Sequence, residues 1–188
     1  GATPAVFAVH DSDLYFPRTV FQEILDEYPD VRRLMLVQTA VGNPLHPNVS
    51  VNLGRSSVNA YRNPTDKAYL ELTKYYQFTL ESSDTETALD DFRQSVEYTA
   101  NGVPPFVLPG NTLATGVATE RLADLLSIDG IIGSDDLVIE SGWEKRGSAN
   151  QLSLWQRTST SPEFFFATST VVIATDQARL DYIFNSET

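Results

Sequence analysis

Cysteine is absent from the chain, and its absence excludes several kinds of chemistry at once. Without it the protein has no disulfide, no zinc site built on thiolates and no cysteine nucleophile. Histidine is nearly as scarce, with His10 and His46 alone. The sequence also lacks any run of 18 apolar residues, so it predicts no membrane-spanning helix. Its first residues, Gly1–Pro4, show neither the charged nor the apolar region of a secretion signal.

Positive charge is also in short supply. Asp and Glu number 25 against 13 Lys and Arg, which gives a net charge of −12, and lysine occurs only at positions 67, 74 and 145. Such a charge repels phosphate backbones, so we expect no direct binding to nucleic acid. Few lysines with many carboxylates are typical of proteins from salt-loving organisms, where the Debye length falls to about 3 Å. An ordinary acidic mesophilic protein is the alternative interpretation.

The sequence motifs of common enzymes are missing as well. Gly54-Arg55-Ser56-Ser57 lacks the second glycine of a nucleophile elbow, and no glycine-rich run precedes a Lys-Ser or Lys-Thr pair. His10 stands beside Asp11 and Asp13, but this spacing matches no metal motif, and a surface loop is the simpler interpretation. His46 lies in a loop bracketed by prolines. We therefore predict no catalytic residue, no cofactor, no metal and no enzymatic activity.

Two acidic stretches are candidates for cation binding. Asp84-Thr85-Glu86, with Asp90 and Asp91, carries enough charge for calcium but lacks the periodicity of an EF-hand loop. The segment 129–136 is the better candidate, because two glycines would let backbone carbonyls, Asp135 and Asp136 surround an ion. The simpler interpretation is a solvated loop in both places. Asn48-Val49-Ser50 matches a glycosylation sequon, a match that often arises by chance.

Alternation of apolar and polar residues is the strongest local signal in the chain. Over 69–80 it places five apolar side chains on one face and predicts a strand of roughly 40 Å. The run Leu34-Met35-Leu36-Val37 predicts a strand that is covered on both faces. Together the patterns predict ten extended segments: Ala5–Val9, Arg33–Val41, Val49–Leu53, Val58–Tyr61, Ser95–Thr99, Leu113–Val117, Leu137–Glu140, Gln151–Thr158, Phe164–Thr175 and Arg179–Phe184, besides the segment 69–80.

Three segments have helical spacing instead: Pro17–Tyr28, Thr85–Val96 and Thr119–Ser127. Turn sequences such as Asn43-Pro44 and Pro109-Gly110 separate the predicted strands, and no linker or repeat divides the chain. We therefore predict one domain over residues 1–188, all-β in class. We expect a β-sandwich in the form of a single jelly roll with short helical crossovers.

Aromatic residues are the remaining feature with a functional interpretation. Phe164-Phe165-Phe166 predicts a central strand, or a strand with one face buried against another subunit. Trp143 lies in the segment 141–147, which predicts a loop tip where the indole is either exposed to a partner or stacked locally. Trp155 alternates away from Leu152 and Leu154 and therefore faces the opposite side of its strand.

In size, strand pattern, acidic Arg-over-Lys composition and missing catalytic set, the chain resembles the small major capsid proteins of tailless icosahedral viruses of haloarchaea. The resemblance covers the whole chain without a diagnostic motif and carries over no residue. It implies a single vertical jelly roll that forms a capsid lattice with copies of itself and with a larger jelly-roll protein. It further implies neighbours among membrane-associated or vertex proteins of the virion, manufacture in the host cytoplasm, and assembly that is favoured by salt.

Two other function classes stay open at this stage. A carbohydrate-binding or adhesin-like sandwich would use Trp143, Trp155 or the pair Tyr75 and Tyr76 as a stacking platform for sugars. A cupin-like metal oxygenase would need about three clustered histidine or glutamate ligands, and the two remote histidines serve that role poorly.

Overall fold

The computed structural model describes residues 20–40, 53–59, 67–81, 103–159 and 171–185. Their strands are β1 (Arg33–Gln38), β2 (Ser56–Ser57), β3 (Phe106–Val107), β4 (Thr112–Leu113), β5 (Gly130–Ser134), β6 (Val138–Ile139), β7 (Trp143–Ala149) and β8 (Leu152–Arg157). Their helices are α2 (Val20–Asp26), α4 (Lys67–Glu81), α6 (Val117–Leu125) and α7 (Asp176–Asn185). None of these helices combines the length and the apolar character needed to cross a lipid bilayer.

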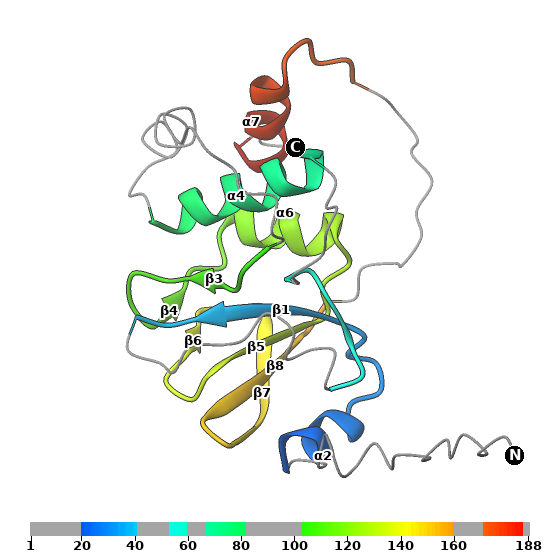
Figure 1. The fold of residues 1–188 in the computed structure, drawn as a ribbon, viewed down its shortest axis with the longest axis vertical. Helices are drawn as coiled ribbons and strands as arrows, with labels where there is room; N and C mark the ends of the chain where they lie inside the picture. Colours follow the sequence, from blue (N-terminus) through cyan, green and yellow to red (C-terminus); the bar gives the residue numbers. More distant parts are fainter. Residues whose placement is uncertain (1–19, 41–52, 60–66, 82–102, 160–170, 186–188) are drawn as a thin grey trace, which may run out of the picture.

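Strand β1 lies inside a mixed sheet, with neighbours on both sides (Figure 1). Strand β5 pairs with it on one side, β2 and β3 pair with it on the other, and all three run parallel to it. Strands β8 and β7 extend the sheet antiparallel beyond β5, which gives the order β2-β1-β5-β8-β7, and β4 and β6 form a separate parallel pair. Parallel neighbours need a crossover connection. Helices α4 and α6, which lie between β1 and β5 in sequence, are part of that connection.

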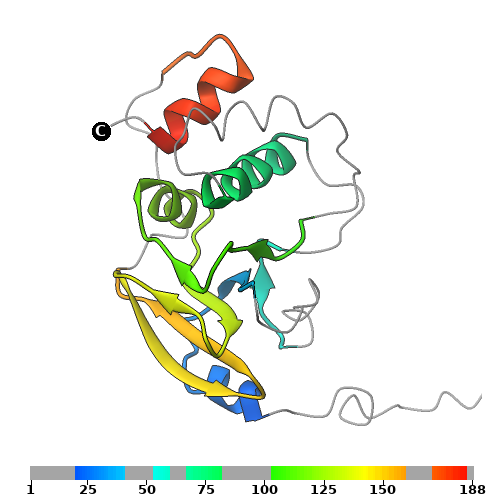
Figure 2. The same cartoon turned by 90° about the vertical axis from the view of Figure 1, so that its left-hand side faces the viewer.

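Helices cover both faces of the large sheet (Figures 1 and 2). The layer of α4, α6 and α7 lies on one face and α2 lies on the other. Side chains of β1 point alternately to the two faces of the sheet. Met35 and Val37 belong to the core beneath α4, α6 and α7, and Leu34 and Leu36 belong to the core beneath α2. The four-residue apolar run of this strand is therefore explained by burial on both faces.

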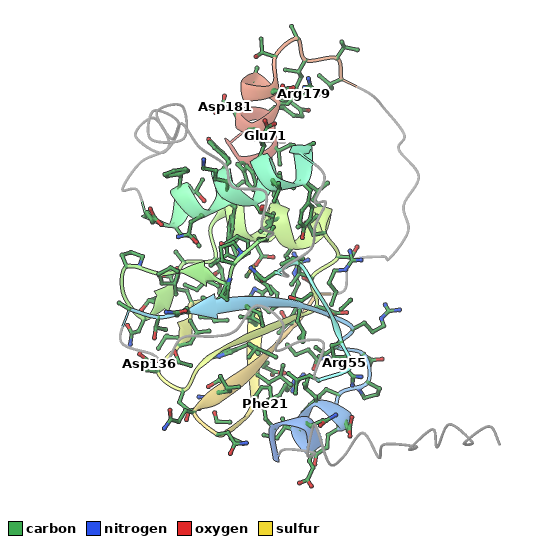
Figure 3. All side chains as sticks on the ribbon, viewed as in Figure 1. Phe21, Arg55, Glu71, Asp136, Arg179 and Asp181 are labelled. Carbon is green, nitrogen blue, oxygen red and sulfur yellow. The ribbon has the colours of Figure 1, made fainter. Side chains whose placement is uncertain are left out.

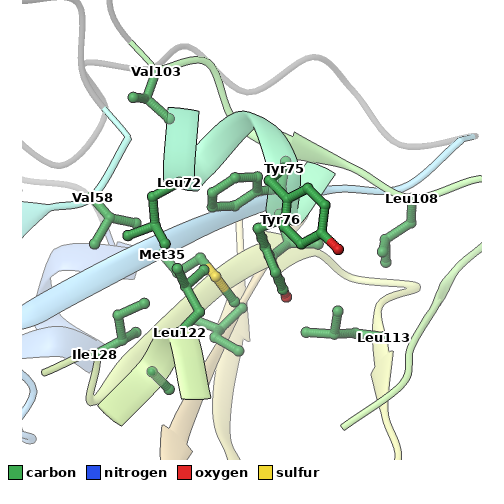
Figure 4. Close-up of a cluster of buried hydrophobic side chains, with 14 of the residues drawn as sticks. Met35, Val58, Leu72, Tyr75, Tyr76, Val103, Leu108, Leu113, Leu122 and Ile128 are labelled. Carbon is green, nitrogen blue, oxygen red and sulfur yellow. The ribbon is translucent and has the colours of Figure 1, made fainter. Parts of the chain in front are cut away.

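The larger core is rich in aromatic contacts, and part of it is shown in Figure 4. The ring of Tyr76 meets the ring of Phe106 edge-on at 4.9 Å between centroids, and Phe184 of α7 lies 5.3 Å from Tyr75. Such pairs contribute about 0.5–1.5 kcal/mol beyond the area that they bury. Phe184 thus packs helix α7 against α4, and α6 is the other neighbour of α7.

The predicted fold is confirmed only in its coarser part, a β-rich fold, since the described residues form mixed sheets with eight strands. The predicted single jelly roll is not confirmed. The predicted strands at Arg33–Val41, Leu137–Glu140 and Gln151–Thr158 correspond to β1, β6 and β8. The predicted helices at Pro17–Tyr28 and Thr119–Ser127 correspond to α2 and α6. In each case the boundaries differ from the prediction by a few residues.

The predicted strand over 69–80 is wrong, because these residues form helix α4. The decisive positions are Tyr75 and Tyr76, which are both fully buried in the same core. Consecutive residues of a strand point to opposite faces, whereas consecutive residues of a helix can share one broad apolar stripe. The hydroxyl of Thr73 also donates to the carbonyl oxygen of Tyr69, four residues earlier, a bond that helical geometry allows.

Three further predictions near the strands need correction. The segment Arg179–Phe184 lies within helix α7, where Leu180 and Phe184 share a face at a spacing of four residues. Of the segment Leu113–Val117, only Leu113 is in a strand, and Val117 begins α6. Strand β2 ends just before Val58, so the segment Val58–Tyr61 is not a strand where it is described.

Other predicted elements lie mostly or wholly outside the described residues. These are Ala5–Val9, Val49–Leu53, Thr85–Val96, Ser95–Thr99 and the greater part of Phe164–Thr175, including Phe164-Phe165-Phe166. The last residues of that final segment are described and are not in a strand.

Candidate functional site

Polar side chains gather where two parallel strands end. Thr39 directly follows β1, Ser134 ends β5, and Asp135 and Asp136 follow β5. The chain leaves β1 for β2 and β3 on one side and later returns to β5 on the other side. Ligands of open α/β sheets bind outside the carboxyl ends of the strands at such a reversal of strand order. This position makes the carboxyl ends of β1 and β5 the best candidate site among the described residues.

Hydroxyl groups hold the Asp136 carboxylate at this position. The hydroxyl oxygen of Thr39 lies 2.8 Å from that of Ser134, and Thr39 donates to Asp136 at 3.0 Å. Thr39 and Ser134 are buried, and Figure 3 shows Asp136 at the end of the sheet to which β1 points. The pKa of Asp136 lies below its ordinary value, chiefly because Ser134 hydrogen-bonds to the carboxylate and Thr39 adds to the effect.

The second carboxylate is held by different groups. Asp135 accepts a hydrogen bond from the hydroxyl of Ser153 at 3.3 Å, and the backbone carbonyl of Asp135 accepts one from Lys145 at 3.4 Å. Two carboxylates that act as general acid and base share a site or face a common substrate. Asp135 and Asp136 instead bond to separate partners, so they are not arranged as such a pair. Among the described residues, no group of three or more His, Asp or Glu side chains is arranged to hold a metal ion. The arrangement ties β5 to β1 and to β8.

The cation loop considered for residues 129–136 is not a loop over most of its length. Gly130–Ser134 is the buried strand β5, and its backbone pairs with β1 and β8. The side chain of Asp129 accepts hydrogen bonds from the backbone N–H groups of Arg32 and Arg33 at 2.9 and 2.8 Å. Burial raises the pKa of Asp129, although these hydrogen bonds oppose the effect. The carbonyls proposed for an ion are therefore used by the sheet.

Both glycines of this strand sit where a side chain would collide with the core. A Cβ at Gly130 would lie 2.8 Å from the Leu34 side chain, and one at Gly133 would lie 3.1 Å from the backbone oxygen of Val37 and closer still to Leu137. The glycines thus allow close packing on the two faces of β5, and they are not a sign of a flexible ion-binding loop.

The second polar cluster joins α6 to the antiparallel strands. Arg157 of β8 pairs with Glu120 at 2.5 Å and with Asp124 at 2.7 Å, and the indole N–H of Trp143 donates to Glu120 at 3.2 Å. Burial by itself would lower the pKa of Arg157, but the hydrogen bonds to Asp124 and Glu120 raise it above its ordinary value. Nothing in the sequence spacing links these residues, since Arg157 lies more than 30 positions from either carboxylate.

The aromatic platform expected for a sugar-binding module is not exposed. Trp143 begins strand β7 with 6% of its surface exposed, so the predicted loop tip is a strand from residue 143 onward and Trp143 is not exposed to a partner. The alternative, local packing of Trp143, agrees with its place in the larger core. Tyr75 and Tyr76 are fully buried. Trp155 faces the larger core, as its alternation with Leu154 predicts, and the ammonium group of Lys145 lies over its ring at 5.8 Å. Three of these four residues are therefore buried, and Trp155 is partly buried.

Several candidate residues lie outside the described part of the chain. They are His10, Asp11, Asp13, His46, Asn48, Asp84, Glu86, Asp90 and Asp91. Their chemical roles stay predictions from the sequence.

Comparison with protein-family models, with curated proteins and with solved structures returns no match. The functional argument therefore depends on this chain's own residues.

Proposed function

We propose that the chain is a structural subunit that works by assembling with copies of itself and with a second, larger protein, as in the capsid of a tailless virus of haloarchaea. The observation that carries the proposal is the charge of −12 with ten arginines and three lysines. Proteins with this balance repel one another in dilute buffer and associate when salt screens the carboxylates. The proposed site of action is the virion shell.

Exposed apolar side chains on α6 and α7 support a contact surface. Val117 and Leu125 of α6 and Tyr182 of α7 are exposed, and the guanidinium of Arg121 joins the two helices by donating to the backbone oxygens of Tyr182 and Ile183. Just before α7, Val172 is 96% exposed. Contiguous exposed apolar surface marks protein interfaces, and we propose that these side chains contribute to one.

The described strand pairings differ from those of a jelly roll. A jelly roll is built from antiparallel strands. Four of the six described strand pairings are parallel, namely β1 with β2, β3 and β5, and β4 with β6. The proposal of an assembly role therefore depends on charge and exposed surface, and not on this topology.

Sedimentation of the full chain over a range of KCl concentrations tests the proposal. We expect monomers or small oligomers at low ionic strength and larger, defined assemblies at molar salt, because the Debye length shortens from about 10 Å at 0.1 M to about 3 Å at 1 M. Monodisperse monomers at every salt concentration, alone and with the other proteins of the candidate virion, would refute it.

One control separates the effect of charge screening from a general strengthening of apolar burial, and a pair of variants tests the apolar surface. Sucrose strengthens apolar burial without screening charge. We therefore expect no assembly in sucrose at low salt. Val172→Asp tests the apolar surface, and we expect it to weaken assembly at molar salt while Thr112→Asp, an exposed polar position on β4, leaves assembly unchanged.

A further inference from the structure

The outer edge of strand β3 makes hydrogen bonds to a side chain. Strand β3 pairs with β1 along one side, where the N–H of Leu108 donates to the carbonyl of Gln38 at 2.9 Å. The carbonyl of Pro104 faces the same side and accepts from the Asn59 side chain. Since successive backbone groups of a strand alternate in direction, the N–H and C=O of Val107 point away from the sheet. They face helix α4 (Figure 1).

The amide of Gln77 bonds to both groups of Val107. The N–H of Val107 donates to Gln77 Oε1 at 2.8 Å, and Gln77 Nε2 donates to the Val107 oxygen at 2.8 Å. A neighbouring strand would make this same pair of bonds. The second N–H of Gln77 Nε2 donates to the Glu81 carboxylate, one helical turn later, at 2.6 Å. Both N–H groups and the oxygen of the Gln77 amide are therefore engaged in hydrogen bonds.

Prolines flank this position along the edge. Pro105 and Pro109 lie two residues before and two residues after Val107. By the alternation of the strand, the residue at 105 also faces outward, and proline has no N–H to offer. Between 105 and 109, Val107 therefore supplies the outward-facing N–H, and Gln77 accepts its hydrogen bond. Proline on an edge strand is a known protection against pairing with other chains.

We propose that Gln77 is an edge guard, whose amide occupies the place of a neighbouring strand and keeps β3 from pairing with an extended strand of a second copy of this chain. Glu81 is the positioning residue that holds the amide in that orientation. The guard excludes this edge as a contact between copies. This proposal on Gln77 does not depend on the proposed structural role, because a monomeric protein needs the same protection against edge-to-edge pairing.

Exchange of the Val107 amide hydrogen in the full chain tests the contact. We expect Gln77→Met, which keeps the length of the side chain and loses the amide, to speed exchange at Val107 by about threefold to tenfold. Gln77→Glu keeps an acceptor for the N–H but loses both donated bonds and sets a second carboxylate beside Glu81, so we expect it too to exchange faster than the unaltered protein. Gln156→Met is the matched control, because it removes an amide that bonds to Arg146 and not to a strand edge. Unchanged exchange in Gln77→Met would overturn the proposal.

Self-association tests the consequence for the edge. We expect the double variant Gln77→Met/Pro105→Thr, which frees the Val107 groups and adds a second outward N–H, to associate with rising concentration in sedimentation experiments. Pro105→Thr alone keeps the guard and should sediment like the unaltered protein. A double variant that sediments like Pro105→Thr at every concentration would overturn the proposal. Gln77 is only half-buried and Pro105 is buried, so the circular dichroism spectrum of each variant is recorded first, and the comparison uses variants that keep the native spectrum.

Discussion

The ion pairs of Arg157 give the most demanding test of this structure. The guanidinium side chain is 4% exposed, while its partners Glu120 and Asp124 are 33% and 63% exposed. The cation thus lies inside the fold, and both anions reach water. Removal of the cation and removal of the anions should therefore have different effects on the free energy of unfolding.

Removal of both carboxylates leaves a buried guanidinium without its two counter-ions. Breaking a buried pair in this way costs about 3–5 kcal/mol. We expect Glu120→Ala/Asp124→Ala to lower the free energy of unfolding by about 3 kcal/mol or more, although alanine is the best helix former and does not weaken α6. Arg157→Met removes the buried charge, keeps much of the volume and leaves two carboxylates that water can solvate. We expect it to cost less than about 2 kcal/mol.

Urea unfolding followed by tryptophan fluorescence measures both variants. A constant m-value with a lower midpoint shows a change in stability and not in the exposed area. Arg146→Met is the matched control, since Arg146 pairs with Glu144 at the surface and an exposed pair contributes about 0–1 kcal/mol. The reasoning fails if the Glu120/Asp124 double variant costs no more than Arg146→Met, or if Arg157→Met costs more than the double variant.

Two further predictions concern the strand β5 and its ends. Asp136→Asn should remove stability at neutral pH, and because the folded-state pKa of Asp136 is lowered, the difference from the unaltered protein should vanish as the pH falls below about 3.8. Asp129, whose folded-state pKa is raised, should show the opposite slope, because its contribution to stability falls as the pH rises from about 3.8 through the folded value. Urea unfolding of Asp129→Asn and Asp136→Asn over this pH range measures both slopes, and two slopes of the same sign would contradict one of the two assignments. Gly133→Ala should lower the free energy of unfolding by about 1–3 kcal/mol, because its Cβ would press on the Val37 backbone and on Leu137. Gly116→Ala, where a Cβ meets no atom within 4 Å, is the control, and equal losses from the two variants in urea unfolding would refute the packing argument.

The candidate site was only partly within reach of sequence analysis. Asp135 and Asp136 could be singled out as neighbours in a glycine-containing acidic segment. Thr39 could not be connected with them, because the two strands that bring Thr39 and Ser134 within 2.8 Å are 95 residues apart in sequence. Arg157 could not be connected with its partners on α6 for the same reason, since the partners lie more than 30 residues earlier in the sequence. The signal that would have helped is strand order, and local periodicity does not contain it.

What the sequence determined by itself is the charge, the absence of cysteine chemistry and the elements whose pattern has a single interpretation. The run Leu34–Val37 is such a pattern, since four apolar residues in a row suit a strand buried on both faces. Tertiary structure decided the rest. In 69–80, apolar residues are so frequent that both the strand period and the helix period fit, and only packing against α6, α7 and β3 selects the helix. Glycines 130 and 133 suggested a loop, and their true role depends on Val31, Leu34 and the Val37 backbone, which lie more than 90 residues earlier and which no local pattern brings near.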